Sequence, residues 1–142
     1  MREILFRGKT ILHNKWVEGA FSMKDCDSPF GEMVDNPSII KYEEPYSGFW
    51  NRVYPETVGQ FTGLTDKNGK KIFEGDIVLY EWYERKPMKF QIEYVCGEFL
   101  AVPVKKREDV WSIRISAQGK NFEVIGNIHD NPELLEGGAE DD

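Results

Sequence analysis

Hydrophobic and polar residues alternate most regularly between residues 88 and 94, where Met88, Phe90, Ile92 and Tyr94 are separated by polar side chains. A period of two residues is typical of a β-strand that buries one face. Four other short segments with strand patterns lie nearby, at 76–84, 99–104, 111–115 and 122–128. In the fourth of the five predicted strands, the alternation places Trp111, Ile113 and Ile115 on one face. The region after residue 75 is therefore predicted to be all β.

The five predicted strands leave no room for a helix, which favours a small closed or nearly closed barrel with few exposed edges. An OB-fold commonly has a helix between its third and fourth strands, whereas this chain has only a short charged linker at 105–109. We therefore predict an SH3-like barrel over residues 63–131. The turns between its strands are predicted at Cys96-Gly97 and around Gln118-Gly119.

The N-terminal part, 1–62, is predicted to be a smaller β and irregular subdomain. Segments 2–8 and 15–21 are rich in aromatic and β-branched residues and form a predicted hairpin that turns at His13-Asn14. Residues 22–56 contain four of the seven prolines, which exclude a long helix and confine any strand to a sheet edge. We expect an irregular connection here, mobile at 22–37, whose aromatic side chains pack on the protein body. These side chains are Phe30, Tyr42, Tyr46, Phe49, Trp50 and Tyr54.

Two further local signals lie near the start and the end of the predicted barrel. Asn68-Gly69 favours a tight turn with positive φ. A calcium loop that starts at Asp66 is excluded because its twelfth position is Ile77, where a glutamate is required. Pro132 is suited to the first position of a helix of one or two turns, and the end of the chain, 137–142, is predicted to be disordered.

With 142 residues, 40% hydrophobic and 30% charged, the chain fits one globular domain or two small ones. The net charge of −7 arises largely from an acidic C-terminal tail. Residues 85–120, in contrast, carry eight basic and four acidic side chains, a modest excess that phosphate groups or acidic partners would recognise. The candidate binding residues in and beside this segment are Trp82, Arg85, Lys86, Lys105, Lys106 and Arg107.

Three segments of the chain carry long ordered motifs: FRGK followed by KWVEG, then ETVGQFTGLTDKNGKKIFEGDIV at 56–78, and EVIGNIHDNPELL at 123–135. Together they resemble the YopX family of small phage and prophage proteins. The resemblance implies a mainly β protein with an SH3-like C-terminal half, but no activity. The motif residues with distinctive backbone or polar chemistry are Gly63, Asp66, Asn68, Gly69, Glu74, Gly75, Asp76, Gly126, Asn127, Asn131 and Pro132.

We interpret these motif residues as architectural. Gly75 supplies a positive φ before a strand, Asp76 accepts backbone N–H groups, and Gly126 indicates a bulge or a close backbone approach. Asn127 and Asn131 are suited to capping nearby backbone groups. The alternative is a polar site in which Asp76, Asn127 and His129 gather at one end of the barrel.

Known catalytic motifs are absent from the sequence: it has no G-x-S-x-G, P-loop, G-x-G-x-x-G or H-E-x-x-H. With two cysteines outside any C-x-x-C pair and two histidines, structural zinc has no support, and we expect no metal or other cofactor.

Three hypotheses of function remain. The first is a non-catalytic phage accessory module that binds a phage or host protein or its own copies. The second is single-stranded nucleic-acid binding through 85–120. The third is a hydrolase that uses Asp76 and His129. No segment is long and apolar enough to predict a membrane span or a signal peptide, so the cytoplasm of the host cell is the expected location.

Overall fold

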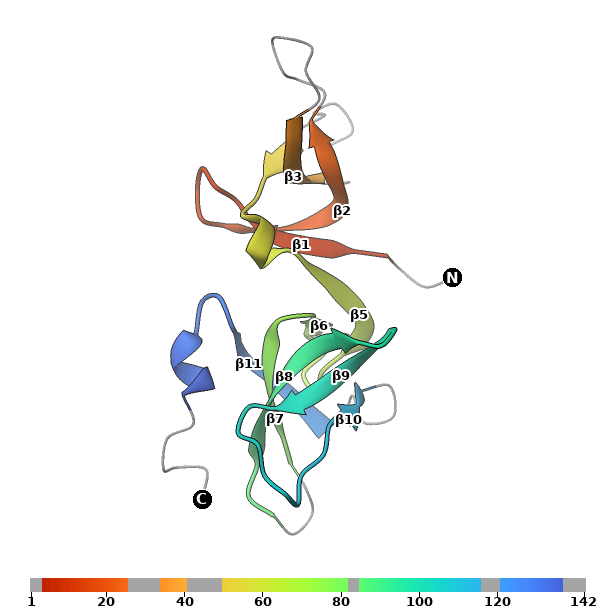
Figure 1. Ribbon diagram of the computed structural model, residues 1–142, viewed down its shortest axis with the longest axis vertical. Coiled ribbons are helices and arrows are strands. Elements are labelled where there is room, and N and C mark those ends of the chain that lie inside the picture. The colour runs from red at the N-terminus through yellow and green to blue at the C-terminus, as the bar shows by residue number, and fades with distance from the viewer. Residues whose placement is uncertain (1–3, 26–33, 41–49, 82–84, 116–120, 137–142) are drawn as a thin grey trace. The chain divides into compact units, whose positions relative to one another are not determined.

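The computed structural model describes residues 4–25, 34–40, 50–81, 85–115 and 121–136. Most of these residues belong to antiparallel strands, which confirms a mainly β protein (Figure 1). The chain forms two compact units, residues 1–61 and 62–142. None of the helices within the described ranges has the length and apolar character that crossing a membrane requires.

The first unit contains the predicted N-terminal hairpin, formed by β1 (Phe6–Lys9) and β2 (Trp16–Asp25). The turn between them closes through the Asn14 N–H, which donates to the Thr10 carbonyl at 2.9 Å, and Asn14 has a φ of 51°. β2 then pairs with β3 (Val34–Ile40), which pairs with β4 (Trp50–Arg52). On the other side of the hairpin, β1 pairs with the first residues of β5 (Gly59–Thr65).

The strands β3 and β4 correct our expectation of an irregular connection over 22–56. β3 contains Pro37 and yet lies between two partners, in the order β4-β3-β2. The reason is a register shift: Ser22 pairs with Ser38, but Lys24 pairs with Asp35, so Pro37 falls in a bulge. A bulge is one of the few places where a sheet tolerates the missing N–H of proline. Most of the aromatic residues of this region fall outside what the structure describes.

The small core of the first unit is built around Val17, Ile39 and Val53, each at most 6% exposed. Gly8 of β1 packs directly on Val53. A Cβ at position 8 would lie 2.9 Å from both the Cβ and the Cγ1 of Val53. This contact is closer than side chains normally allow, so glycine is required here for steric reasons.

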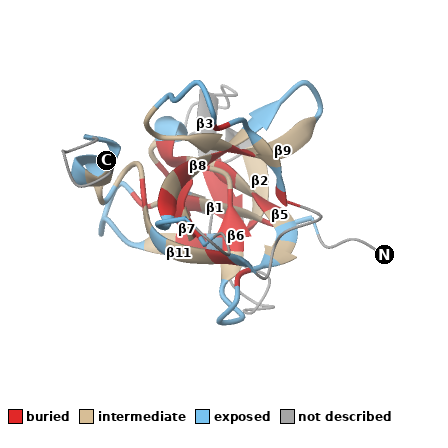
Figure 2. Ribbon diagram, turned by 90° about the horizontal axis from the view of Figure 1, so that it is seen from below, coloured by how far each residue is buried: buried red, intermediate tan, exposed pale blue. Residues whose placement is uncertain are grey.

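The second unit contains the five strands expected between residues 76 and 128. They are β7 (Asp76–Tyr80), β8 (Met88–Val95), β9 (Glu98–Pro103), β10 (Ile113–Arg114) and β11 (Phe122–Asn127). β8 shows the predicted alternation, with Met88, Phe90 and Ile92 buried (Figure 2). The β8–β9 turn lies at Cys96-Gly97, as predicted, and both residues have positive φ.

The sheet of the second unit is not closed, whereas the sequence predicted a closed or nearly closed barrel. Its order is β10-β9-β8-β7-β11, so β10 and β11 are its two edges. β10 contains only two residues and therefore cannot supply a ladder long enough to close the sheet. One face is nevertheless well packed, because the rings of Tyr80, Phe90 and Phe122 contact one another at centroid distances of 4.9–6.5 Å.

Two short elements complete the framework. β6 (Lys71–Phe73) follows the second half of β5 after a tight turn, and β6 is the last strand of the sheet that β5 joins. After β11, a single 3-10 turn, η3 (Pro132–Leu135), begins at Pro132 as predicted. The predicted disorder of 137–142 concerns residues outside the described ranges.

Candidate functional site

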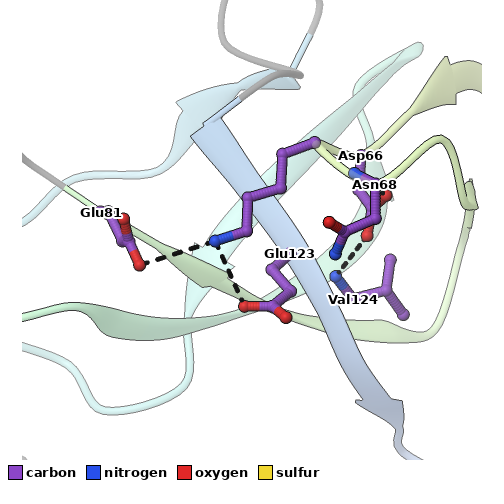
Figure 3. A network of polar contacts seen from close by, with 6 residues as sticks. Asp66, Asn68, Glu81, Glu123 and Val124 are labelled. Atoms are coloured by element: carbon purple, nitrogen blue, oxygen red, sulfur yellow. Dashed lines mark hydrogen bonds and ion pairs between the residues drawn. The ribbon is translucent and has the colours of Figure 1, made fainter.

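The turn Asp66–Lys70, which we call the Asp66 turn, is organised by one carboxylate. Asp66 Oδ1 accepts the N–H groups of Asn68 at 2.8 Å and of Lys70 at 2.9 Å. Its Oδ2 accepts the N–H of Val124 in β11, also at 2.9 Å (Figure 3). Gly69, with a φ of 81°, supplies the left-handed conformation that the turn requires. Asp66 therefore closes its own turn and attaches it to a distant strand.

These hydrogen bonds affect the pKa of Asp66, a residue that is only 5% exposed. Burial by itself raises the pKa of the carboxyl group. The N–H groups of Val124, Lys70 and Asn68 and the positive charge of Lys70 outweigh burial and hold the pKa below its ordinary value of 3.8. At neutral pH the carboxylate is ionised and its oxygens are engaged by the backbone.

Lys67 adds a second link between this turn and the strands beside it. Its N–H donates to the Phe122 carbonyl at 3.0 Å. Its ammonium lies 3.4 Å from Glu123 Oε2 and 3.7 Å from Glu81 Oε1 (Figure 3). Both ion pairs are partly exposed and so stabilise the fold weakly.

Asp76 shapes a second turn, between β6 and β7. Its Oδ2 accepts the N–H of Phe73 at 2.8 Å, and Gly75 between them has a φ of 91°. Gly75 also donates its N–H to the Ile92 carbonyl and accepts the N–H of Ile128 on its own carbonyl. The turn between β6 and β7 is therefore bonded to β8 through Ile92 and to the end of β11 through Ile128. Asp76 itself is only 1% exposed.

Asn127 shapes the third turn, at the end of β11. Its Oδ1 accepts the N–H groups of His129 at 3.0 Å and Asp130 at 2.9 Å, and its amide donates to Asp130 Oδ2 at 3.2 Å. Asn131 Oδ1 in turn accepts the Asn127 N–H at 3.3 Å. These contacts bend the chain back on itself immediately before η3.

Gly126 lies in the predicted bulge, since the pairing of β11 with β7 shifts between Val124 and Gly126. A Cβ on Gly126 would lie 2.5 Å from Asn131 Oδ1 and 2.9 Å from Leu134 Cδ1. The third turn therefore packs against the backbone of the bulge. The remaining motif residues are Gly63, with a φ of 88° within β5, and the half-buried Glu74 beside Gly75.

The three residues of the alternative polar site are neighbours in the fold, because Asn127 is the cross-strand partner of Asp76 and Asn127 Oδ1 accepts the His129 N–H. Asp76 Oδ2 and Asn127 Oδ1 both bind backbone N–H groups. No group of three or more His, Cys, Asp or Glu side chains suited to a metal ion occurs in the described part of the chain. The three side chains that shape the turns, Asp66, Asp76 and Asn127, thus each accept at least one backbone N–H group.

A different surface of the second unit carries the predicted basic residues. Arg85 Nη1 lies 3.3 Å from Asp109 Oδ2, and Arg107 Nε lies 3.2 Å from Asp109 Oδ1. One carboxylate thus joins the loop before β8 to the loop between β9 and β10. Lys86 and Lys106 are exposed on these loops, and Lys105 is half-buried. Trp82, the aromatic residue predicted to accompany them, lies outside the described residues.

Trp111 is the feature of this surface that the sequence pattern placed wrongly. The alternation grouped it with Ile113 and Ile115, yet Trp111 is 79% exposed while Ile115 is buried. A tight turn, in which the Val110 N–H donates to the Arg107 carbonyl, precedes it, and β10 begins only at Ile113. Trp111 therefore lies outside the ladder. We call this area the Trp111 surface: Arg85, Lys86, Lys105, Lys106, Arg107, Asp109 and Trp111.

These features define a small, mainly antiparallel β protein with a framework of carboxylate- and amide-closed turns. The model of the family described as YopX protein matches residues 5–136, nearly the whole chain. The chain belongs to the YopX family. The solved structures include a similar protein, EF1440 from Enterococcus faecalis, with 25% sequence identity and a TM-score of 0.55. The match covers 95% of this chain and 99% of that one. No curated protein matches.

Proposed function

We propose that this chain is a non-catalytic module that acts by binding another macromolecule through the Trp111 surface. The observation that carries the proposal is the contrast between the two sets of polar residues. Asp66, Asp76 and Asn127 direct their side-chain oxygens to backbone N–H groups, whereas the Trp111 surface presents an indole and several cations to solvent. Tryptophan and arginine are both enriched at interaction sites relative to the rest of a protein surface.

Site-specific photocrosslinking tests this proposal. A benzophenone amino acid would replace Ser112, which is exposed and adjacent to Trp111, in cells that express the chain. The matched control position is Lys70, exposed on the Asp66 turn of the same unit. We expect a discrete crosslinked product at position 112 that position 70 does not give. The same products at both positions, or none at either, would overturn the proposal.

Self-association is a second candidate function, favoured by a different observation. Ile11 and Leu12 occupy the turn between β1 and β2 and are 48% and 86% exposed. Adjacent apolar side chains at a hairpin tip are suited to burial against a second copy of the chain. Light scattering at micromolar concentration should then show a dimer or larger species that Leu12→Ser dissociates. A strict monomer would remove this candidate.

We propose two further properties together with the binding role. The first is that the chain acts in the cytoplasm of a host cell as a phage or prophage accessory protein, supported by its membership of the YopX family. Cell fractionation and the identity of the neighbouring genes test it.

The second is an SH3-like topology for the second unit, supported by the last strand, β11, which returns to pair with the first of the five strands, β7.

A further inference from the structure

We propose that the ligand of the Trp111 surface is single-stranded nucleic acid, with Trp111 as the stacking platform and the surrounding cations as phosphate contacts. The inference rests on the proposed binding function and specifies its partner. It commits to unpaired strands because a base can stack on an exposed indole only when it is not enclosed in a duplex.

The exposure of Trp111 is the first observation. Its fractional exposure of 79% compares with 54% for Tyr94, whose ring rests on Phe99 at a centroid distance of 5.0 Å. An indole that is this exposed leaves a ring face accessible to a stacked base. Each stacked base typically contributes enough affinity for an alanine substitution to be measurable.

The arrangement of charges is the second observation. The Trp111 surface contains five basic side chains and one acidic side chain, Asp109, and Glu108 is exposed beside Asp109 in the chain. Asp109 holds Arg85 and Arg107 side by side through single contacts of 3.3 and 3.2 Å. A guanidinium carries five N–H donors, and one such contact uses only part of that capacity. Both arginines therefore keep donors that suit phosphate oxygens, and Asp109, which they share, lies two residues before Trp111 in the chain.

Asp109 has opposite consequences for two kinds of ligand, which makes it the most informative position. For a phosphate backbone, Asp109 competes for both guanidiniums and repels the ligand, so its removal should tighten binding. For a protein partner that recognises the fixed geometry of the three side chains, removal of Asp109 should weaken binding. The sign of the Asp109→Asn effect therefore separates nucleic acid from a protein ligand.

The experiment is a fluorescence anisotropy titration of the full chain with labelled oligothymidine of roughly 20 nucleotides, at about 50 mM salt. A duplex of the same length and polyglutamate are the competing ligands. We expect binding of the single strand in preference to both, with an affinity that falls as salt rises. Trp111→Ala should weaken binding by about tenfold or more, and Trp111→Phe should retain part of the affinity.

Matched controls separate a local effect from a global one. Arg114 is exposed and paired with Glu98 at 3.2 Å, just as Arg107 is paired with Asp109. Arg107→Ala should weaken binding and reduce the salt dependence, whereas Arg114→Ala should change neither. Tyr94→Ala serves in the same way as the control for Trp111→Ala. Unchanged urea midpoints would show that each variant is folded.

Several outcomes would overturn the inference. They are the absence of binding to the single strand, equal binding of polyglutamate, and an affinity that Trp111→Ala leaves unchanged. If any one of these results is obtained and position 112 still crosslinks to a protein, the nucleic-acid proposal fails and the proposed binding function stands. If position 112 also gives no product above the control, both proposals fail.

Discussion

Asp66 Oδ2 accepts the backbone N–H of Val124 at 2.9 Å, although 58 positions separate the two residues in the chain. The same carboxylate closes its own turn through Asn68 and Lys70. A single buried side chain thus couples the β5–β6 turn to the edge strand β11. Its replacement should therefore be one of the most damaging polar substitutions in the second unit.

Asp66→Asn should lower the free energy of unfolding by about 1–3 kcal/mol near neutral pH. One amide oxygen cannot replace both carboxylate oxygens, and the amide NH₂ would face a backbone donor. Urea unfolding followed by circular dichroism would measure the change. A stability equal to wild type would contradict the central role of this carboxylate.

The lowered pKa of Asp66 predicts how the difference in unfolding free energy between wild type and Asp66→Asn depends on pH. The stabilisation is fully present above the unfolded-state pKa, near pH 4, and is lost as the pH falls through the lower folded-state pKa. Asparagine does not titrate. The difference in unfolding free energy between wild type and Asp66→Asn should therefore be constant from about pH 7 to 5 and shrink below about pH 4. A difference that stays constant down to about pH 2 would contradict the assignment.

Lys67→Ala, on the same turn, should cost less than about 1 kcal/mol. Its ammonium forms partly exposed ion pairs with Glu81 and Glu123 rather than buried hydrogen bonds. The loss should diminish further in high salt, which screens exposed charges. A large, salt-independent loss measured by urea unfolding would show that these ion pairs are stronger than their exposure indicates.

Gly126→Ala should destabilise the second unit by about 1–3 kcal/mol, because the new methyl group would meet Asn131 and Leu134. Gly97→Ala is the comparison: its Cβ would meet nothing within 4 Å, although its φ of +85° still imposes strain. Thermal unfolding should therefore show a larger loss for Gly126→Ala. Equal losses would mean that the contact with Asn131 and Leu134 costs no more than the positive-φ strain at position 97.

Gly8→Ala should be costly because of the contact of 2.9 Å with Val53. Val53→Ala removes the two Cγ atoms that the new methyl group would meet but keeps the Cβ at 2.9 Å, so it relieves part of the contact. In a double-mutant cycle, the two substitutions should therefore be less destabilising together than the sum of their separate effects, by about 0.5 kcal/mol or more. Simple additivity would show that the backbone moves to relieve the contact.

Much of the second unit was predictable because its signals are local. The alternation over β8, the Cys96-Gly97 turn and the bulge at Gly126 each depend on residues close together in the chain. The roles of Asp76 and Asn127 follow from short-range hydrogen bonds. In contrast, the bond from Asp66 to Val124 depends on tertiary pairing, and no spacing in the sequence reveals it.

The features that sequence reasoning missed depend on partner strands or on strand length. Pro37 is tolerated inside a sheet because the register of β2 opposite it shifts, which the proline itself does not indicate. Closure of the barrel depends on the length of β10, which contains two residues rather than the five of the alternating segment. Trp111 lies outside the ladder because β10 begins only at Ile113. The short length of β10 therefore accounts for both the open sheet and the exposed indole.

The long separation between Asp66 and Val124 also has a consequence for synthesis on the ribosome. The ribosome synthesises the Asp66 turn 58 residues before Val124, which completes its bonding, and β7 likewise precedes its partner strand β11. Until β11 leaves the exit tunnel, the growing chain holds β7 and the Asp66 carboxylate without these partners. Consolidation of this unit should therefore follow the synthesis of β11.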